Sequence, residues 1–389
     1  MSVPVALAHD YATQRGGAER VALWLAQAFP DAPMYTTLYD PEGTFPEFGA
    51  LDLRTTGLNR IGVFRRHHRL ALPLLAPAVS AQRVQADVLL TSSTGWAHGY
   101  RGAERTVVYC HAPARWLYQR SRYLSGREGA GLANHARRTL ASGALTALTP
   151  ALRGWDRRAA HRADAYLANS TVTARAIHEA YGIEAEVLPP PPAMLPEGQA
   201  QPVADLEPGF LLCVARLMPY KNVDVLVEAM GLLDGQTLVI VGDGPDRTRL
   251  QSMADQLNAS GTGRVVLLGR VEDAELRWLY QHTGALVAAS YEDYGLSPLE
   301  AGAFGKPSVV LGDGGYLDTV IDGVTGAFFA VPEAERIAAA VADVTAQTWD
   351  TGAIRAHVAG FGLDRFISRL RTVTLECSNF SGARRPRAA

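Results

Sequence analysis

Short apolar runs alternate with longer segments in which apolar residues recur every three or four positions, and the alternation starts near residue 3. Residues 3–10 are typical of a buried strand, and residues 16–29 have the periodicity of an amphipathic helix. Further strands are expected at 86–93, 105–113 and 163–170, with a helix at 171–182. Because strands separated by helices form parallel βαβ units, this part of the chain predicts a doubly wound α/β domain.

A proline-rich stretch at 189–209 interrupts this periodicity and indicates a linker. The alternation then restarts, with strands expected at 209–217, 237–245, 264–271, 284–290 and 306–313 and helices at 222–233, 246–258, 273–283 and 297–305. The fold class expected is therefore α/β, with two doubly wound Rossmann-like domains. Ligands bind at the carboxyl ends of the strands in such sheets, so the strand-to-helix turns of both domains should face a cleft.

The pattern divides the chain into five expected segments. They are a first domain at 1–188, the linker at 189–209, a second domain at 210–358, a C-terminal helix at 359–378 that packs back on the N-terminal domain, and a disordered tail at 379–389.

The composition is that of a soluble globular protein. The chain has 389 residues, too many for one hydrophobic core, and 48% of them are hydrophobic. Its three cysteines are far apart and odd in number, which excludes a disulfide framework and favours a reducing, cytoplasmic setting. The first residues read directly as a strand, without a signal sequence, and the apolar stretch 70–81 is too short to span a membrane.

The net charge of −2 conceals an asymmetry. Residues 54–162 contain 18 arginines, no lysine and four acidic residues, a balance of +14, so the rest of the chain carries −16. Residues 54–86 contain no acidic residue. One interpretation is a solvated arginine-rich face; the other is a surface for anionic lipid or a diphosphate-bearing acceptor. No nucleic-acid recognition motif accompanies the charge, so nucleic acid is not an expected partner.

Two turns carry residues suited to phosphate. Arg216 and Lys221 follow an expected strand just before a helix, where two cations suit a diphosphate. Gly16 and Gly17 lie in the first strand-to-helix turn, where bare backbone can approach a phosphate or sugar. The stretch GDGPDR (242–247) is a Gly-rich turn but a poor dinucleotide fingerprint, because Arg247 takes the third glycine position.

Two carboxylates flank the start of the expected helix at 297–305. Residues 297–300 form a capping-box pattern, in which Ser297 is the cap and Glu300 reaches back to the Ser297 amide. Glu292 has no such structural role, so its carboxylate is a candidate to hold sugar hydroxyls beside the free amides of the helix start. His111 follows an expected strand in the first domain and should point into the cleft.

At these residues the chain resembles the retaining glycosyltransferases of family 4, which have the two-domain GT-B architecture. The matching pieces include ANSTVTARAI (168–177), VARLMPYKNVDVLVEA (214–229), VGDGPDRTRL (241–250) and SYEDYGLSPLEAGAFGKP (290–307). The last contains the Glu, seven residues, Glu signature as Glu292 and Glu300. YCHAPARWLY (109–118) and RLMPYKNVD (216–224) look most like bacterial mannosyltransferases of polysaccharide or lipid-linked glycan assembly.

The resemblance implies roles for these positions. Arg216 and Lys221 would stabilise the leaving diphosphate, Glu292 would contact the transferred sugar, and Glu300 would hold the ribose. The remaining donor contacts would come from Gly16 and Gly17, from Gly269, Arg270 and Val271 beside the base, and from the amides around Gly295, Leu296 and Ser297. His111 would bind the sugar near its reacting carbon. Two departures are Asn222, where Gly is common, and Tyr294, where Phe is frequent.

The sequence and the resemblance together predict a retaining hexosyltransferase, with GDP-mannose as the first choice of donor and a glycan or polyprenyl-linked acceptor. The N-terminal domain would bind the acceptor and the C-terminal domain the nucleotide sugar. The expected location is cytoplasmic, peripheral on the inner face of the membrane. No Asp-x-Asp motif occurs, and we expect no metal or other cofactor. The alternatives are a UDP-hexose enzyme, phosphorylase or sugar-phosphate synthase acting on soluble substrates, and a non-catalytic nucleotide-sugar binder.

Overall fold

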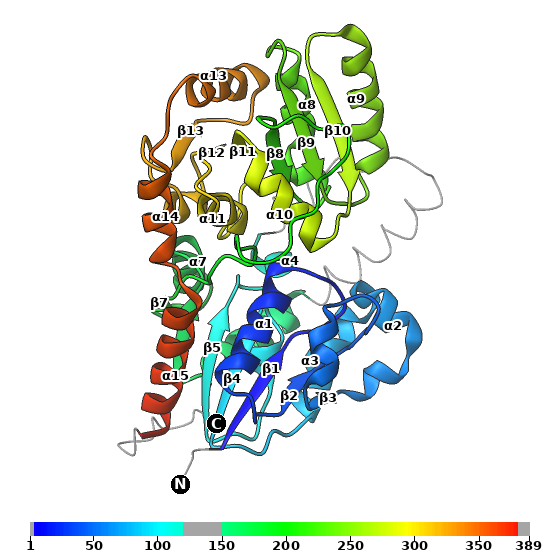
Figure 1. Ribbon diagram of the computed structural model, residues 1–389. Helices are drawn as coiled ribbons and strands as arrows, with labels where there is room; N and C mark the ends of the chain where they lie inside the picture. The colour runs from blue at the N-terminus through cyan, green and yellow to red at the C-terminus, as the bar shows by residue number, and fades with distance from the viewer. Residues whose placement is uncertain (1–3, 120–148, 380–389) are drawn as a thin grey trace. The chain divides into compact units, whose positions relative to one another are not determined.

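The computed structural model describes residues 4–119 and 149–379. The described chain forms two compact units (Figure 1). Unit 1 contains residues 4–119, 149–190 and 363–379, and unit 2 contains residues 191–362. The tail predicted at 379–389 lies outside the described residues except for Asn379, which ends a helix.

The described part of unit 1 contains a seven-stranded parallel sheet in the order β3-β2-β1-β4-β5-β6-β7. Its strands are β1 Val5–His9, β2 Met34–Thr36, β3 Leu53–Thr55, β4 Val88–Ser93, β5 Arg105–Cys110, β6 Ala165–Ala168 and β7 Glu186–Val187. Its helices are α1 Gly17–Ala28, α2 Gly62–Arg66, α3 Leu72–Ala81, α4 Arg115–Tyr118, α7 Thr171–Tyr181, α15 Leu363–Asn379 and an unlabelled one at 149–160. Short 3-10 turns lie at η1 Pro46–Ala50, η2 Gly57–Arg60, η3 His68–Ala71 and η4 Ala97–Gly99.

The described part of unit 2 contains a six-stranded parallel sheet in the order β10-β9-β8-β11-β12-β13. Its strands are β8 Leu211–Val214, β9 Thr237–Val241, β10 Arg264–Gly269, β11 Ala285–Ala288, β12 Ser308–Leu311 and β13 Gly326–Phe329. Its helices are α8 Val223–Met230, α9 Arg247–Ser260, α10 Asp273–His282, α11 Leu296–Ala303, α12 Tyr316–Thr319, α13 Ala334–Thr345 and α14 Thr351–Ala359, with a 3-10 turn, η5, at Pro219–Lys221.

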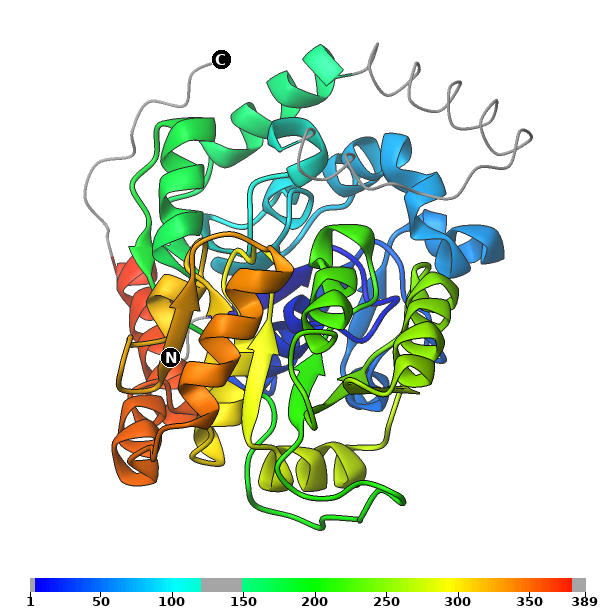
Figure 2. The same ribbon diagram turned by 90° about the horizontal axis from the view of Figure 1, so that it is seen from above.

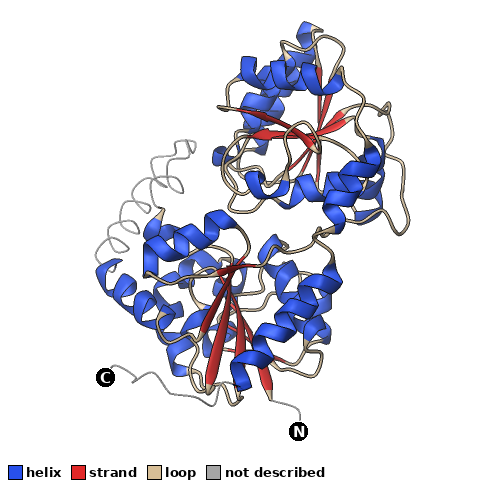
Figure 3. Ribbon diagram, turned by 90° about the vertical axis from the view of Figure 1, so that its left-hand side faces the viewer, coloured by secondary structure: helices blue, strands red, loops and turns tan. Residues whose placement is uncertain are grey.

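Helices cover both faces of each sheet, which confirms the predicted fold class (Figure 3). In unit 2, α8, α9 and α13 bury their apolar residues on one face, where α8 and α13 lie side by side (Figure 2), and α10 and α11 cover the other. Successive residues of a strand point to opposite faces, so Leu211 and Leu212 belong to different apolar clusters. The strands are therefore apolar throughout, as expected for a parallel sheet.

The C-terminal helix α15 packs on the sheet of unit 1 beside α1. The ring of Phe366 lies 5.5 Å from that of Tyr109 on β5 and 6.1 Å from that of Trp24 on α1. Arg369 forms a two-point ion pair with Glu186 of β7, with both N···O distances 2.7 Å. Residues 363–379 thus complete one apolar layer of unit 1. The other described residues of this unit all come before residue 191 in the chain.

The proline-rich stretch predicted as a linker is held on unit 2. Met194 and Leu206 are buried in the apolar cluster that contains α10. The Arg277 guanidinium on α10 donates to the carbonyl oxygens of Leu195 at 3.1 Å and Gln199 at 2.5 Å. These contacts fix the path of the chain between β7 and β8.

Candidate functional site

The predicted donor-site residues of unit 2 lie after three strands that end at the same edge of the sheet. Arg216 and Lys221 follow β8, residues 269–271 end and follow β10, and residues 292–300 follow β11. Since β8 pairs with β11, and β9 lies between β8 and β10, the topology brings these turns together. His111, Gly16 and Gly17 belong to unit 1.

Lys221 and Glu292 form an ion pair at this edge. The Lys221 ammonium donates to Oε1 of Glu292, and the Ser290 hydroxyl donates to the same oxygen at 2.6 Å. The two charged side chains are 14% and 22% exposed, so the pair is accessible but largely shielded from water. Arg216, which lies in the same turn after β8 as Lys221, is exposed. A cation, a carboxylate and a second cation therefore lie on adjacent turns.

Asn222 holds the Lys221 turn in place. Its backbone adopts the left-handed conformation, with φ 52° and ψ 34°, and its side-chain amide donates to the carbonyl oxygen of Ala289 at 2.9 Å. Glycine and asparagine adopt this conformation most readily, which explains why this position accepts Asn in place of the more common Gly. The side chain adds a link between the β8 and β11 turns that glycine lacks.

The predicted capping box at Ser297 is wrong. Helix α11 begins at Leu296, its N-cap is Gly295, and no side chain caps it. Gly295 has φ 85°, and a Cβ there would lie 2.6 Å from the ring of Tyr316, so the backbone passes directly over that ring. Leu296 and Ser297 thus occupy the first turn, where helical N–H groups have no partner within the helix and attract anions.

Glu300 is held by a tyrosine. The Tyr280 hydroxyl on α10 donates to Oε2 of Glu300 at 2.7 Å. The Tyr280 ring is fully buried and stacks on Phe304 at 5.5 Å. Burial, and then the charge of Glu300, raise the pKa of Tyr280 well above its usual value, so this hydroxyl remains a hydrogen-bond donor.

The segment predicted to border the base contains a second glycine in the left-handed region. Gly269 has φ 74°, and its carbonyl oxygen accepts from the Gly242 amide at 2.7 Å. A Cβ on Gly269 would lie 2.7 Å from Nη1 of Arg247, so the guanidinium lies directly against the glycine. Arg270 is exposed and Val271 is partly buried.

In unit 1, the Gly16–Gly17 turn starts α1, with Gly16 as its N-cap. A Cβ on Gly16 would lie 2.7 Å from Oε2 of the buried Glu19 carboxylate. The absence of a side chain at residue 16 therefore allows a carboxylate to pack under the turn.

His111 lies immediately after β5 with its ring buried. Its Nε2 is 2.8 Å from the hydroxyl oxygen of Ser92 on β4, and that oxygen is 3.0 Å from Nδ1 of His9 on β1. Burial, together with the positive charges of His9 and Arg115, lowers the pKa of His111 to about 3. The ring is therefore neutral at pH 7 and suited to hydrogen bonding with a hydroxyl group.

Sequence reasoning missed Ser290, Tyr280, His9 and Ser92. The first two act on the predicted glutamates through contacts that depend on tertiary packing. His9 and Ser92 had a readable signal, because both are polar residues at the carboxyl ends of neighbouring strands.

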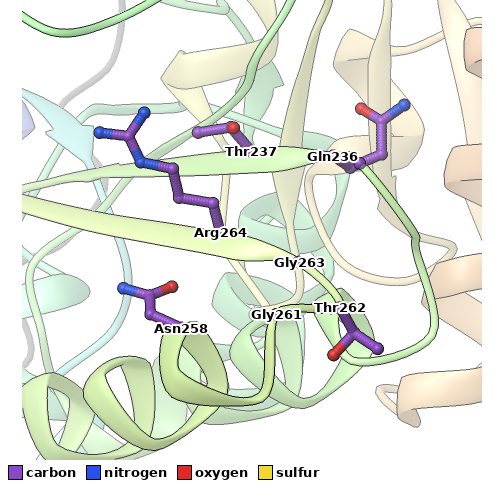
Figure 4. Close-up of a pocket in the computed structure, with 8 residues that line it drawn as sticks. Gln236, Thr237, Asn258, Gly261, Thr262, Gly263 and Arg264 are labelled. Carbon is purple, nitrogen blue, oxygen red and sulfur yellow. The ribbon is translucent and has the colours of Figure 1, made fainter.

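A surface hollow of about 450 Å³ lies elsewhere on unit 2, at the amino-terminal ends of β9 and β10 (Figure 4). Its lining includes Gln236, Thr262, Arg264 and Asn258. The Asn258 amide is already bonded to the backbone N–H and carbonyl of Val265, at 2.8 and 2.9 Å. The hollow contains none of the predicted site residues. Among the described residues, no group of three or more His, Cys, Asp or Glu side chains could hold a metal ion.

Relatives among curated proteins match parts of this chain. A D-inositol 3-phosphate glycosyltransferase from Mycobacterium avium (strain 104) is 33% identical over 171 residues, which are 41% of this chain and 40% of that protein. A GDP-mannose-dependent alpha-(1-6)-phosphatidylinositol monomannoside mannosyltransferase from Mycolicibacterium smegmatis is 32% identical over 193 residues, 46% of this chain and 49% of that protein. These matches therefore span less than half of the relatives' own length.

Solved structures match almost the whole fold. Anabaena Alr3699/HepE in complex with UDP and glucose has a TM-score of 0.65 at 17% identity, covering 96% of this chain and 100% of that one. Sucrose-phosphate synthase from Thermosynechococcus elongatus has a TM-score of 0.67 at 19% identity, covering 96% and 99%. At these identities the likeness shows the fold, which is that of the GT-B glycosyltransferases.

Two family models divide the chain between them. Residues 15–191 match the model described as Glycosyltransferase Family 4, and residues 196–351 match the one described as Glycosyl transferases group 1. The two matches correspond to the two Rossmann-like units and include the site residues discussed above, except His9. The chain therefore belongs to the GT-B glycosyltransferases that combine a Family 4 domain with a group 1 domain.

Proposed function

We propose that this glycosyltransferase moves a hexose, mannose from GDP-mannose, to a hydroxyl of a lipid-linked or polysaccharide acceptor with retention of configuration. The observation that carries the proposal is the Lys221–Glu292 pair beside Arg216 and the start of α11. Two cations and the first-turn amides suit a diphosphate, and a carboxylate on the adjoining turn suits sugar hydroxyls, which supports a nucleotide-sugar donor.

The proposed reaction proceeds on one face of the sugar. The bond between the anomeric carbon and the diphosphate oxygen breaks while the acceptor hydroxyl attacks from the same side. The hydroxyl proton passes to the departing diphosphate. Arg216, Lys221 and the α11 amides stabilise the negative charge that develops on the leaving group. Because two cations perform this task, we propose that the reaction needs no metal ion, and loss of activity on adding a chelator would contradict this.

The choice of donor rests on relatives. The mannosyltransferase from Mycolicibacterium smegmatis uses GDP-mannose by its name, and this supports GDP-mannose here. The Anabaena structure contains UDP and glucose, which keeps a UDP-hexose as the second candidate.

A thermal-stability assay with GDP, GDP-mannose, UDP and UDP-glucose, all with chelator present, tests the donor. A ligand at 100 times its Kd stabilises the folded state by about 2.7 kcal/mol, which shifts the melting temperature measurably. Shifts with the guanine compounds alone support the proposal, and shifts with the uracil compounds alone replace mannose by another hexose. No shift with any nucleotide would overturn the donor site. A Lys221→Ala, Arg216→Ala variant serves as the control, because it should lose the shift.

The acceptor is proposed to lie at an anionic membrane surface. The stretch 54–86 of unit 1 exposes Arg60, Arg65 and Arg66. Four large apolar side chains of the same stretch are also exposed: Ile61, Val63, Leu70 and Leu74, at 44%, 48%, 59% and 43%. Arginines near an anionic leaflet contribute about 1 kcal/mol each, and apolar side chains add burial at the lipid boundary. Among the described residues, no helix is long and apolar enough to cross a membrane.

Sedimentation with vesicles tests this surface. We expect binding to vesicles containing phosphatidylglycerol, release at high salt, and loss of binding in an Arg65→Gln, Arg66→Gln variant. Leu232→Ser, which removes an exposed leucine of unit 2, is the matched control. Equal binding to neutral and anionic vesicles would contradict an electrostatic surface.

A further inference from the structure

Three buried polar residues connect neighbouring strands of unit 1 behind His111. His9 ends β1, Ser92 lies near the end of β4, and His111 follows β5. His9 and Ser92 are direct partners in the sheet register. The Ser92 hydroxyl oxygen lies 3.0 Å from Nδ1 of His9 and 2.8 Å from Nε2 of His111. We call these three residues the Ser92 relay. They are 2%, 0% and 7% exposed, so water does not compete for their hydrogen bonds.

Both imidazoles of the relay are neutral at pH 7. Burial lowers the pKa of His9, although the charge of Asp10 and the carbonyl groups of Ser92 and Tyr11 oppose this effect. Burial also lowers the pKa of His111 to about 3. Each ring then carries one proton, and the single hydroxyl proton between them can point to only one ring. If both rings donated to Ser92, the hydroxyl proton would have no acceptor, because the Ser92 side chain has no third partner among the described residues. The relay therefore runs either from His9 to His111 or from His111 to His9.

The far nitrogen of His9 favours one direction. Its Nε2 is buried and has no hydrogen-bond partner in the described part of the chain. The carbonyl groups of Ser92 and Tyr11 approach the His9 ring but are not in hydrogen-bonding geometry with this nitrogen, so a relay toward His9 would give it a buried N–H with no acceptor among the described residues. If the relay runs toward His111, Nε2 carries only a lone pair. Orphaned buried N–H groups are rarer in folded proteins than acceptors that lack a donor, so the second arrangement is favoured.

We propose that His9 donates from Nδ1 to Ser92, and that the Ser92 hydroxyl donates to Nε2 of His111, which fixes His111 as the tautomer protonated at Nδ1. The Nδ1 of His111 has no hydrogen-bond partner within the described residues and is not among their buried unpartnered atoms. This N–H is thus presented to a ligand as a donor. His9 and Ser92 are positioning residues that act through His111.

The tautomer of His111 indicates which kind of ligand its Nδ1–H group would bind. A neutral N–H donor pairs with the oxygen of a hydroxyl group, so the expected partner is a sugar hydroxyl and not a phosphate, which would pair better with a cation. The identity of this ligand rests on the proposed function. The direction of the relay does not, because it follows from burial and hydrogen bonding in unit 1 alone.

Nitrogen-15 NMR of the histidine rings in the full-length protein tests the direction without any activity. The spectra distinguish a ring protonated at Nδ1 from one protonated at Nε2. The signals that disappear in the His111→Asn variant are those of the His111 ring. We expect the Nδ1–H tautomer in the natural protein and a shift toward Nε2–H in Ser92→Ala. A natural protein with Nε2–H, or a Ser92→Ala variant with an unchanged tautomer, would overturn the proposal.

Thr91→Val is the matched control, because Thr91 lies next to Ser92 on β4 and its hydroxyl is buried without a partner. This variant removes a buried hydroxyl from the same strand but should leave the His111 tautomer unchanged. A tautomer change in Thr91→Val as large as that in Ser92→Ala would mean that a general disturbance of β4, and not the loss of the relay, changes the His111 tautomer.

The catalytic consequence is tested on the same variants with nucleotide sugar and acceptor. Loss of the relay should lower kcat about tenfold in Ser92→Ala and His9→Leu, with KM for the nucleotide sugar nearly unchanged, because one hydrogen bond is misdirected. His9→Asn keeps an N–H near the Nδ1 position and should restore most of kcat. If His9→Asn is folded but no more active than His9→Leu, the direction is wrong. If the natural protein transfers no sugar at all, the proposed function fails, and the NMR result still decides the relay.

Discussion

The ammonium group of Lys221 is paired with the carboxylate of Glu292, although 71 positions separate the two residues in the chain. The same carboxylate oxygen accepts the Ser290 hydroxyl. Without a ligand, the cation proposed for the diphosphate is thus neutralised by the carboxylate proposed for the sugar. Binding of a nucleotide sugar would therefore have to rearrange this pair, with the ammonium turning toward phosphate and the carboxylate toward hydroxyl groups.

Glu292→Gln should separate these two roles. We expect kcat to fall at least about tenfold, because the sugar loses its anionic contact in the transition state. The Kd for the nucleoside diphosphate should stay the same or decrease, since Lys221 loses a competing carboxylate. Steady-state kinetics and calorimetric titration with GDP measure the two quantities. Unchanged turnover in this variant would remove Glu292 from the site.

The Tyr280–Glu300 contact predicts that two conservative substitutions affect different properties, one mainly stability and the other mainly donor affinity. Tyr280→Phe leaves a part-buried carboxylate without its hydroxyl donor and should lower the free energy of unfolding by about 1–2 kcal/mol. Glu300→Gln keeps an oxygen that accepts from Tyr280, so its stability should change by less than about 1 kcal/mol, while donor affinity falls. Urea denaturation and GDP titration provide the comparison. Equal destabilisation by both variants would mean that the hydroxyl–carboxylate bond is not what holds Glu300.

Asn222 should tolerate glycine better than alanine. Asn222→Gly loses the bond to Ala289 but keeps the left-handed backbone accessible, and should cost about 1 kcal/mol. Asn222→Ala loses the same bond and also places a Cβ in that conformation, adding about 1 kcal/mol or more. Denaturant midpoints rank the three proteins. An alanine variant at least as stable as the glycine variant would contradict the backbone argument.

The buried His111 ring predicts a loss of stability at acid pH. Its pKa is about 3 in the folded protein, below the usual value of 6.5, so between these values the unfolded chain binds a proton that the folded chain does not. Stability contributed by the neutral ring is therefore fully present above about pH 6.5 and is lost as the pH falls, by up to about 1.4 kcal/mol per pH unit.

Urea unfolding between about pH 7.5 and 5 measures this effect, with His111→Asn as the reference. The free energy of unfolding of the natural protein should decrease more steeply toward low pH than that of the variant. Parallel curves would show that the histidine does not contribute to the acid sensitivity.

The repeating pattern of apolar runs and amphipathic segments was sufficient to predict two parallel-sheet domains, because each strand of such a sheet is buried on both faces. The position of the candidate site residues could be predicted where they lie at the ends of strands. Arg216, Lys221 and Glu292 lie on neighbouring turns because strand order places them there. The capping box failed because the start of α11 is set by close packing of Gly295 on Tyr316, a contact with no local sequence signal. The roles of Tyr280 and Ser290 likewise depend on tertiary contacts.

The return of α15 to unit 1 has a consequence for biosynthesis. Phe366, Leu370 and Val373 belong to the same apolar cluster as Leu7 of β1 and Tyr109 of β5. During translation, the surface that α15 will cover stays open until residues 363–379 have been made, which is after the whole of unit 2 has been synthesised. Unit 1, although its synthesis begins before that of unit 2, therefore cannot bury this apolar face with its own residues until unit 2 has been made.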